Sequence, residues 1–122
     1  MAKKATPFSN ITVLDFSRYL PGGYATQVLA DLGAEVIKVE DTGLGDFMRH
    51  DYPTMGGGIS YYITALGRNK KSVSLNLKDS EVVDWFLKMA KEADIIVESF
   101  RPGVTAKLGI DYETVKAINP RI

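Results

Sequence analysis

Short apolar runs alternate with helix-like segments along most of this chain, and the alternation limits its possible folds more than any other feature. Each of four runs is predicted to be a strand because it is brief, rich in β-branched residues and bounded by turn residues. The runs are 11–16, 35–40, 72–77 and 94–98. Strand–helix–strand units of this length close with parallel strands and right-handed crossovers. The sequence therefore predicts an α/β fold, a Rossmann-like open parallel sheet with flanking helices.

The intervening segments are predicted to be helices. The first begins after the Pro21-Gly22-Gly23 turn and ends before Gly33, a residue suited to a C-terminal cap. Further helices are expected at 59–66, after a cap at Asp79 or Ser80, near 105–108 and at 112–118 with Asp111 as cap. The stretch 41–58 is glycine-rich and irregular, and a loop of that length is usually functional or mobile.

Two boundaries follow from this pattern. Residues 1–10 are predicted to be an N-terminal tail, and residues 11–122 to be the Rossmann-like domain. The last helix leads into Asn119-Pro120-Arg121-Ile122, where another strand would be expected. We therefore expect this chain to be a truncated portion of a longer enzyme.

Composition excludes several classes of function. The 122 residues contain 15 basic and 15 acidic side chains, and this balance argues against general nucleic-acid binding. The absence of cysteine excludes disulfides and thiolate chemistry, and the single His50 argues against a metal site, so none is predicted. No apolar run reaches the roughly 18 residues of a membrane span, and no secretory signal opens the chain. We expect a cytoplasmic protein with no membrane partner.

The carboxyl ends of the predicted strands carry the candidate binding residues, since ligands of open parallel sheets bind there. Phe100 and Arg101 follow the fourth strand, and Lys107 lies one turn into the next helix. Aromatic rings stack on bases and arginine grips phosphate with two donors, so these tips suit a phosphorylated ring compound. The alternative is structural: Phe100 covers the edge of the core and Arg101 is a solvated loop charge.

Three other signals are weak. Pro21-Gly22-Gly23 with a distant Glu40 lacks the glycine spacing of the dinucleotide fingerprint. The run Arg68-Asn69-Lys70-Lys71 contacts phosphate in one interpretation and is a solvated lead-in to a strand in the other. His50 and Asp51 are adjacent on a loop, which seldom holds an acid–base pair in geometry.

Several longer motifs together resemble one family. "VLDFSRYLPGGYATQVLADLGAEVIKVE", "RNKKSVSLNLK", "ADIIVESFRPGV" and "LGIDYETVKAINPRI" follow one another in order and cover nearly the whole chain from Ile11. The sequence resembles the N-terminal part of the class III CoA-transferases, the CaiB/BaiF family, which includes formyl-CoA transferase, carnitine-type CoA-transferases and α-methylacyl-CoA racemase.

The resemblance implies a domain that binds coenzyme A (CoA) within a longer chain that forms an interlocked homodimer. In the transferases, an aspartate carboxylate attacks the acyl-CoA thioester, and CoA passes between carboxylic acids through an aspartyl intermediate. None of the nine aspartates present here matches that motif. The chain is therefore expected to supply much of the CoA cradle and no catalytic residue, so that it is inactive alone. Its expected partners are acyl-CoA and a carboxylic acid.

Carried over position by position, the family's CoA contacts fall on ten residues of this chain. They are Leu20, Pro21, Leu75, Asn76, Leu77, Lys78, Ser99, Phe100, Arg101 and Lys107. Three departures from formyl-CoA transferase matter: Leu20 replaces a glutamine, Ser99 replaces an asparagine, and Asp41 replaces a cation, where an acid would repel phosphate.

Two alternatives stay open. The same motifs suit an acyl-CoA racemase or epimerase of this family. The second alternative is that the chain is a non-catalytic module that binds a nucleotide or a partner. Because truncation would expose apolar surface that packs against the rest of the fold, we also expect this chain to self-associate.

Overall fold

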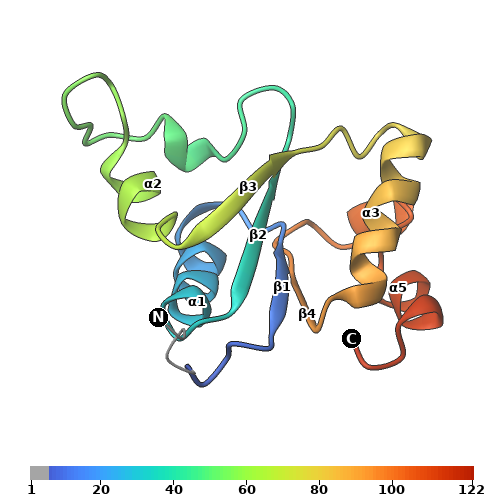
Figure 1. Cartoon of the computed structure of the whole chain (residues 1–122). Coiled ribbons are helices and arrows are strands. Elements are labelled where there is room, and N and C mark those ends of the chain that lie inside the picture. The colour runs from blue at the N-terminus through green and yellow to red at the C-terminus, as the bar shows by residue number, and fades with distance from the viewer. Residues whose placement is uncertain (1–5) are drawn as a thin grey trace.

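The computed structural model describes residues 6–122, which form a four-stranded parallel sheet. The strands are β1 (Thr12–Asp15), β2 (Glu35–Glu40), β3 (Lys70–Ser74) and β4 (Ile95–Val97), in the order β3-β2-β1-β4 (Figure 1). Val13 of β1 pairs with Val36 of β2 on one side and with Ile95 of β4 on the other. The predicted open parallel sheet is confirmed, and β1 lies at its centre.

Helices cover both faces of this sheet. They are α1 (Tyr19–Asp31), the 3-10 turn η1 (Phe47–Arg49), α2 (Tyr61–Leu66), α3 (Ser80–Glu92), α4 (Val104–Lys107) and α5 (Tyr112–Ile118). Figure 1 shows α1 on the opposite side of the sheet from α3 and α5. Because successive side chains of a strand point to opposite faces, Val13 packs toward α1 and Leu14 toward α3 and α5.

The larger of the two cores lies under α3 and α5. Phe86 of α3 is fully buried, and its ring meets that of Phe16 edge to face at 4.7 Å between centroids. Val115 of α5 and Leu14 of β1 belong to the same cluster. This packing fixes the position of the segment 16–18 that follows β1.

Side-chain caps begin three helices. Asp79 accepts a hydrogen bond from Glu81 N–H at 3.0 Å, so Asp79 and not Ser80 caps α3. Asp111 caps α5, as predicted, and Ser60 caps α2.

Two boundaries differ from the prediction by three residues or more. Helix α1 begins at Tyr19, ahead of Pro21-Gly22-Gly23, because proline is tolerated in a first turn that lacks internal partners for its N–H groups. A Cβ at Gly22 would overlap the side chain of Ser17, so glycine here permits close approach rather than a turn. Strand β3 ends at Ser74, although Leu75 N–H still donates to Glu40 O at 2.8 Å and its side chain packs on the core.

The outer face of α1 carries apolar side chains. These are Leu20, Tyr24 and Val28, and Leu32 directly after the helix continues the row at the same four-residue spacing. Their exposed fractions are 49%, 61%, 38% and 40%. A helix that is apolar on both faces is usually covered on both.

Within residues 6–122, no helix combines the length and the apolar character that crossing a bilayer requires.

Candidate functional site

A hollow of about 250 Å³ lies at the carboxyl ends of β1, β2 and β3. Helix α4 and the segment after β4 close it. Apolar side chains form most of its lining: Phe16, Val39, Leu75, Leu77, Phe100, Val104 and Leu108. Its polar residues are Arg18, Glu40, Asp41, Asn76 and Lys78. An apolar hollow with a few polar groups at this edge of a parallel sheet is typical of a ligand site.

Five of the ten predicted CoA contacts line this hollow. They are Leu75, Asn76, Leu77, Lys78 and Phe100. Lys107 lines a second hollow of about 530 Å³ that shares Leu77, Lys78 and Leu108 with the first. Segments that are 30 residues apart in sequence thus meet at one continuous surface.

The other four predicted contacts lie outside both linings. Leu20 and Pro21 are exposed in the first turn of α1, and Arg101 is exposed after β4. Ser99 is also exposed, and its hydroxyl accepts a hydrogen bond from Arg18 N–H at 2.9 Å. Ser99 therefore supports the segment after β1 rather than facing the hollow.

Arg18 is the site residue that sequence reasoning did not single out. Its guanidinium forms an ion pair with Asp41 at 3.0 Å between Nη1 and Oδ2. The same group lies 5.3 Å from the ring centroid of Phe47 and 6.0 Å from that of Phe100. The available signal was its place directly after the first strand, but the resemblance directed attention to Leu20 and Pro21.

Asp41 is held by backbone as well as by Arg18. Its Oδ1 accepts hydrogen bonds from Gly43 N–H at 2.8 Å and Gly45 N–H at 3.3 Å. Burial alone would raise the pKa of Asp41, but these amides and the guanidinium outweigh that effect and lower it. The predicted repulsion of phosphate by Asp41 is thus reduced, since Arg18 balances the carboxylate charge.

Four buried charged side chains lie beneath this surface. Lys38 Nζ lies 2.7 Å from Asp46 Oδ2 and donates to Ser17 O at 2.8 Å. Lys70 Nζ lies 3.1 Å from Asp15 Oδ2. The four side chains are 0–3% exposed.

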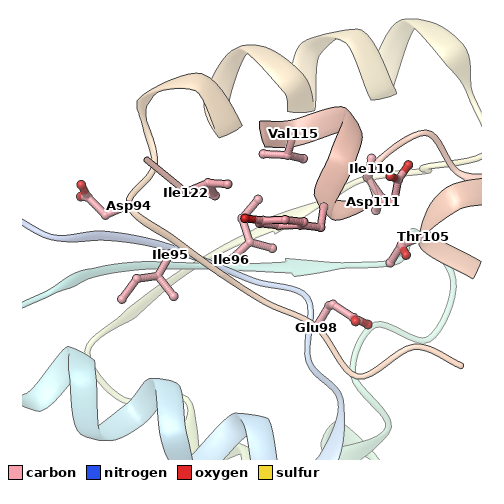
Figure 2. Close-up of a pocket in the computed structure, with 10 residues that line it drawn as sticks. Asp94, Ile95, Ile96, Glu98, Thr105, Ile110, Asp111, Val115 and Ile122 are labelled. Carbon is pink, nitrogen blue, oxygen red and sulfur yellow. The ribbon is translucent and has the colours of Figure 1, made fainter. Parts of the chain in front are cut away.

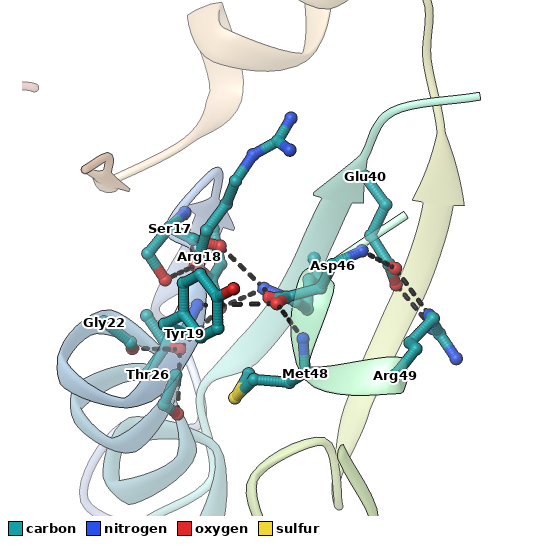
Figure 3. A network of polar contacts seen from close by, with 12 residues as sticks. Ser17, Arg18, Tyr19, Gly22, Thr26, Glu40, Asp46, Met48 and Arg49 are labelled. Atoms are coloured by element: carbon teal, nitrogen blue, oxygen red, sulfur yellow. Dashed lines mark hydrogen bonds and ion pairs between the residues drawn. The ribbon is translucent and has the colours of Figure 1, made fainter. Parts of the chain in front are cut away.

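This network joins the β1–α1 turn to the loop that contains η1. Thr26 of α1 donates to Asp15 Oδ2 at 2.6 Å, and Asp46 accepts from Met48 N–H at 2.9 Å (Figure 3). Tyr19, at the start of α1, has the left-handed φ of 62° and also contacts Asp46 through its N–H. A non-glycine residue in that region persists only where its surroundings hold it.

Lys70 therefore fits neither interpretation of the run 68–71. Its ammonium is buried and donates to Gly23 O at 2.9 Å and Thr26 Oγ1 at 2.6 Å, and burial lowers its pKa. Arg68 and Lys71 are exposed and pair with Asp31 and Glu35. The alternation seen in the sequence could not distinguish a buried strand lysine from a solvated one.

The Glu40 carboxylate forms hydrogen bonds within the fold and is not available to bind a ribose, which is the role of the acid in the dinucleotide fingerprint. Arg49 donates to both its carboxylate oxygens at 2.6 and 2.5 Å, and Ser72 Oγ and Asp46 N–H add further hydrogen bonds. Burial would raise the pKa of Glu40, but these donors lower it to about 2.

His50, which the sequence analysis considered together with Asp51, contacts the backbone of its own loop: its Nε2 lies 2.9 Å from Leu44 O.

A third hollow, of about 390 Å³, lies between β4 and α5. Figure 2 shows Ile96, Ile110 and Val115 pointing into it. Its charged lining residues are the acids Asp94, Glu98 and Asp111. This composition does not suit an anionic ligand, so the hollow at the strand ends is the stronger candidate.

Fold and site together define a doubly wound α/β domain with an apolar hollow at the carboxyl ends of parallel strands. The sequence profile of CoA-transferase family III matches residues 8–122, and the chain belongs to that family.

Relatives of known name are similar over almost the whole chain. An acetyl-CoA:oxalate CoA-transferase of Acetobacter aceti is 43% identical over 121 residues, covering 99% of this chain and 31% of that protein. A formyl-CoA:oxalate CoA-transferase of Escherichia coli is 42% identical, covering 97% of this chain and 28% of that protein.

Solved structures agree with this assignment. A hypothetical protein of Mycobacterium tuberculosis has a TM-score of 0.89 at 38% identity, covering 98% of this chain and 33% of that one. A CaiB/BaiF family protein of Brucella suis has a TM-score of 0.87 at 36% identity, covering 95% and 32%. The chain thus spans about a third or less of the length of these relatives.

Proposed function

We propose that this chain binds CoA, as the nucleotide-side cradle of an enzyme that transfers CoA between carboxylic acids. The observation that carries the proposal is the hollow at the ends of β1, β2 and β3, where Leu75, Phe100 and Lys78 come together. Family membership supports the ligand, and the oxalate named in two relatives supports a carboxylic acid as the second substrate.

The residues around the hollow divide by chemistry. Leu75, Leu77 and Phe100 offer apolar surface for an uncharged ring, while Lys78 and Lys107 offer ammonium groups for phosphates on the side shared with the second hollow. In this proposal Leu20, Pro21, Ser99 and Arg101 meet parts of CoA that extend beyond the hollow. Their exposed positions leave them accessible to such a ligand.

The proposed transfer uses an aspartyl intermediate, and the described aspartates suit that role poorly. Asp15 and Asp46 are buried in ion pairs, and Asp41 is paired with Arg18. A nucleophilic carboxylate needs access to the thioester carbon, so we propose that the reacting aspartate is not among these three. None of the nine aspartates matches the family's motif for the reacting residue, so in this proposal the 122-residue chain alone is a binding unit without transferase activity.

Calorimetric titration of the chain with CoA tests the proposal. We expect saturable binding that Lys107→Met weakens, because one phosphate-facing ammonium is lost. Lys91→Met is the matched control, since Lys91 is exposed on α3 outside both linings. No heat of binding from the unaltered chain would refute the proposal.

The racemase alternative predicts a different reaction around the same cradle. A full-length enzyme that contains this chain and exchanges the α-proton of acyl-CoA for solvent deuterium would belong to that branch. Formation of a new thioester from oxalate and acetyl-CoA by that full-length enzyme would support the transferase assignment instead. Binding with neither reaction is the result expected of a cradle alone.

A further inference from the structure

We propose that the exposed side of α1 is an interface between two copies of this chain, which pair through antiparallel α1 helices about a two-fold axis midway along the helix. The proposal goes beyond CoA binding and does not depend on it. No residue of this side lines any of the three hollows described above.

The exposed side of α1 is almost entirely apolar. Between positions 20 and 32 its exposed residues, which we call the α1 face, are Leu20, Pro21, Tyr24, Ala25, Val28, Asp31 and Leu32. Asp31 is the one charged residue among them, and the buried side of the helix packs on the sheet through Ala30. The cores of protein interfaces are depleted of charged residues and enriched in aromatic ones such as Tyr24, so this face has the composition of an interface.

The spacing of the large side chains makes the α1 face self-complementary. They recur at 20, 24, 28 and 32, so the row is symmetric about position 26. When two copies run antiparallel about a two-fold axis at that position, Tyr24 meets the partner's Val28 and Leu20 meets the partner's Leu32. Because such a contact is isologous, each of these pairs forms twice. A second copy of the chain therefore matches the row along its whole length.

Charge favours the antiparallel arrangement over the parallel one. Helix α1 has no acid in its first turn and no side-chain cap at its N-terminus, whereas Asp31 is its last residue. Since a helix is positive at its N-terminus, antiparallel pairing brings each Asp31 toward the end of the partner helix that attracts an acid. Parallel pairing would bring the two Asp31 carboxylates together, although each also pairs with Arg68 at 2.6 Å.

The net charge of the chain and the size of the face set the strength of pairing. A formal net charge of zero leaves little long-range repulsion between copies. The row from Leu20 to Leu32 spans about 18 Å of helix. One helix pair of that length falls short of a standard interface, which buries about 1,600 Å². We therefore expect a dissociation constant in the micromolar range, with monomers dominating in dilute solution.

Cysteine cross-linking tests the pairing directly, because the chain contains no cysteine. Tyr24→Cys and Val28→Cys are prepared as separate proteins and oxidised alone and as an equal mixture. A disulfide needs a Cα separation of about 4.4–6.8 Å, so only residues that face each other should link efficiently. Antiparallel pairing predicts that the mixture forms a dimer containing one copy of each variant, identified by its intact mass, and that each variant alone forms much less.

A charge placed on the α1 face tests the surface itself. Ala25→Arg leaves the buried side of α1 unchanged, and sedimentation equilibrium should show a dissociation constant raised by about tenfold or more, because the interface would bury unpaired cations. Ala117→Arg is the matched control, since Ala117 is an exposed alanine of α5, on the opposite side of the sheet (Figure 1). Ala25 is not among the predicted CoA contacts, so calorimetry with CoA on the same samples measures the proposed function separately.

Three results would overturn the inference. A chain that stays monomeric at millimolar concentration would refute the interface, whether or not it binds CoA. Cross-linking of each cysteine variant alone as efficiently as in the mixture would exclude the antiparallel register. Dimers that Ala25→Arg and Ala117→Arg affect equally would place the contact on another surface.

Discussion

Replacing Lys70 with methionine would leave a buried carboxylate without its closest cation. The Lys70 side chain is 2% exposed, and its ammonium lies 3.1 Å from Asp15 Oδ2. It also donates to Gly23 O and Thr26 Oγ1, two groups of α1. Methionine fills most of the space, so the change removes charge and hydrogen bonds rather than packing.

Removing one partner of a buried pair costs about 3–5 kcal/mol, because the other charge stays buried and uncompensated. Here Lys38 Nζ remains 3.9 Å from Asp15 Oδ2, and Ser17 N–H still donates to the carboxylate at 2.9 Å. Because these groups still compensate part of the Asp15 charge, we expect a loss at the lower end of that range, about 3 kcal/mol. A domain with total stability of about 5–15 kcal/mol would remain mostly folded at 25 °C.

Urea unfolding at neutral pH measures this loss directly, with an unchanged m-value as the test that the denatured state is comparable. Lys71→Met is the matched control, because its side chain is 73% exposed in a surface pair with Glu35, worth at most about 1 kcal/mol. Adding Asp15→Asn to Lys70→Met should recover part of the stability, since both charges are then absent. Equal losses in the Lys70 and Lys71 variants, or no recovery in the double variant, would refute the reasoning.

Other features of the fold are equally testable. Gly22→Ala should destabilise the fold by about 2 kcal/mol or more, because its Cβ would overlap the side chain of Ser17. Gly23→Ala is the comparison, because its Cβ would lie 3.0 Å from Met48 Cε and 3.7 Å from Leu66 Cδ1 and the gain in helix propensity of up to about 1 kcal/mol offsets that crowding. Thermal unfolding should show a clearly larger loss for Gly22→Ala, and equal effects would contradict the clash. Folding lowers the pKa of Glu40 from 4.5 to about 2. The stabilisation that the ionised carboxylate provides is therefore fully present above the unfolded pKa, and about 3 kcal/mol of it should be lost as the pH falls from about 5 to about 2. Urea unfolding across that range should show no such loss for Glu40→Gln, and an identical profile in both proteins would rule out this carboxylate as the source. Sedimentation should show self-association of the chain, and Tyr24→Glu with Val28→Glu on the exposed face of α1 should reduce it; a monomeric unaltered chain would contradict the prediction.

Sequence alone determined the class of fold. The apolar runs at 11–16, 35–40 and 94–98 could be recognised as strands because buried parallel strands are brief, apolar and bounded by turns. Caps such as Asp111 could be predicted since the hydrogen bond they accept comes from residues two or three positions away. The family could be recognised from the same local motifs, and the sequence profile confirms it.

The tertiary structure alone decided which charges lie at the surface and which stabilise the interior. Lys70 and Lys71 are adjacent and chemically identical, yet one lies on Asp15 beneath α1 and the other in solvent, because side chains alternate across a strand. Arg18 and Asp41 are 23 positions apart, and only the parallel pairing of β1 and β2 brings them together. Charge placement depends on contacts between distant segments, and local sequence patterns do not encode these.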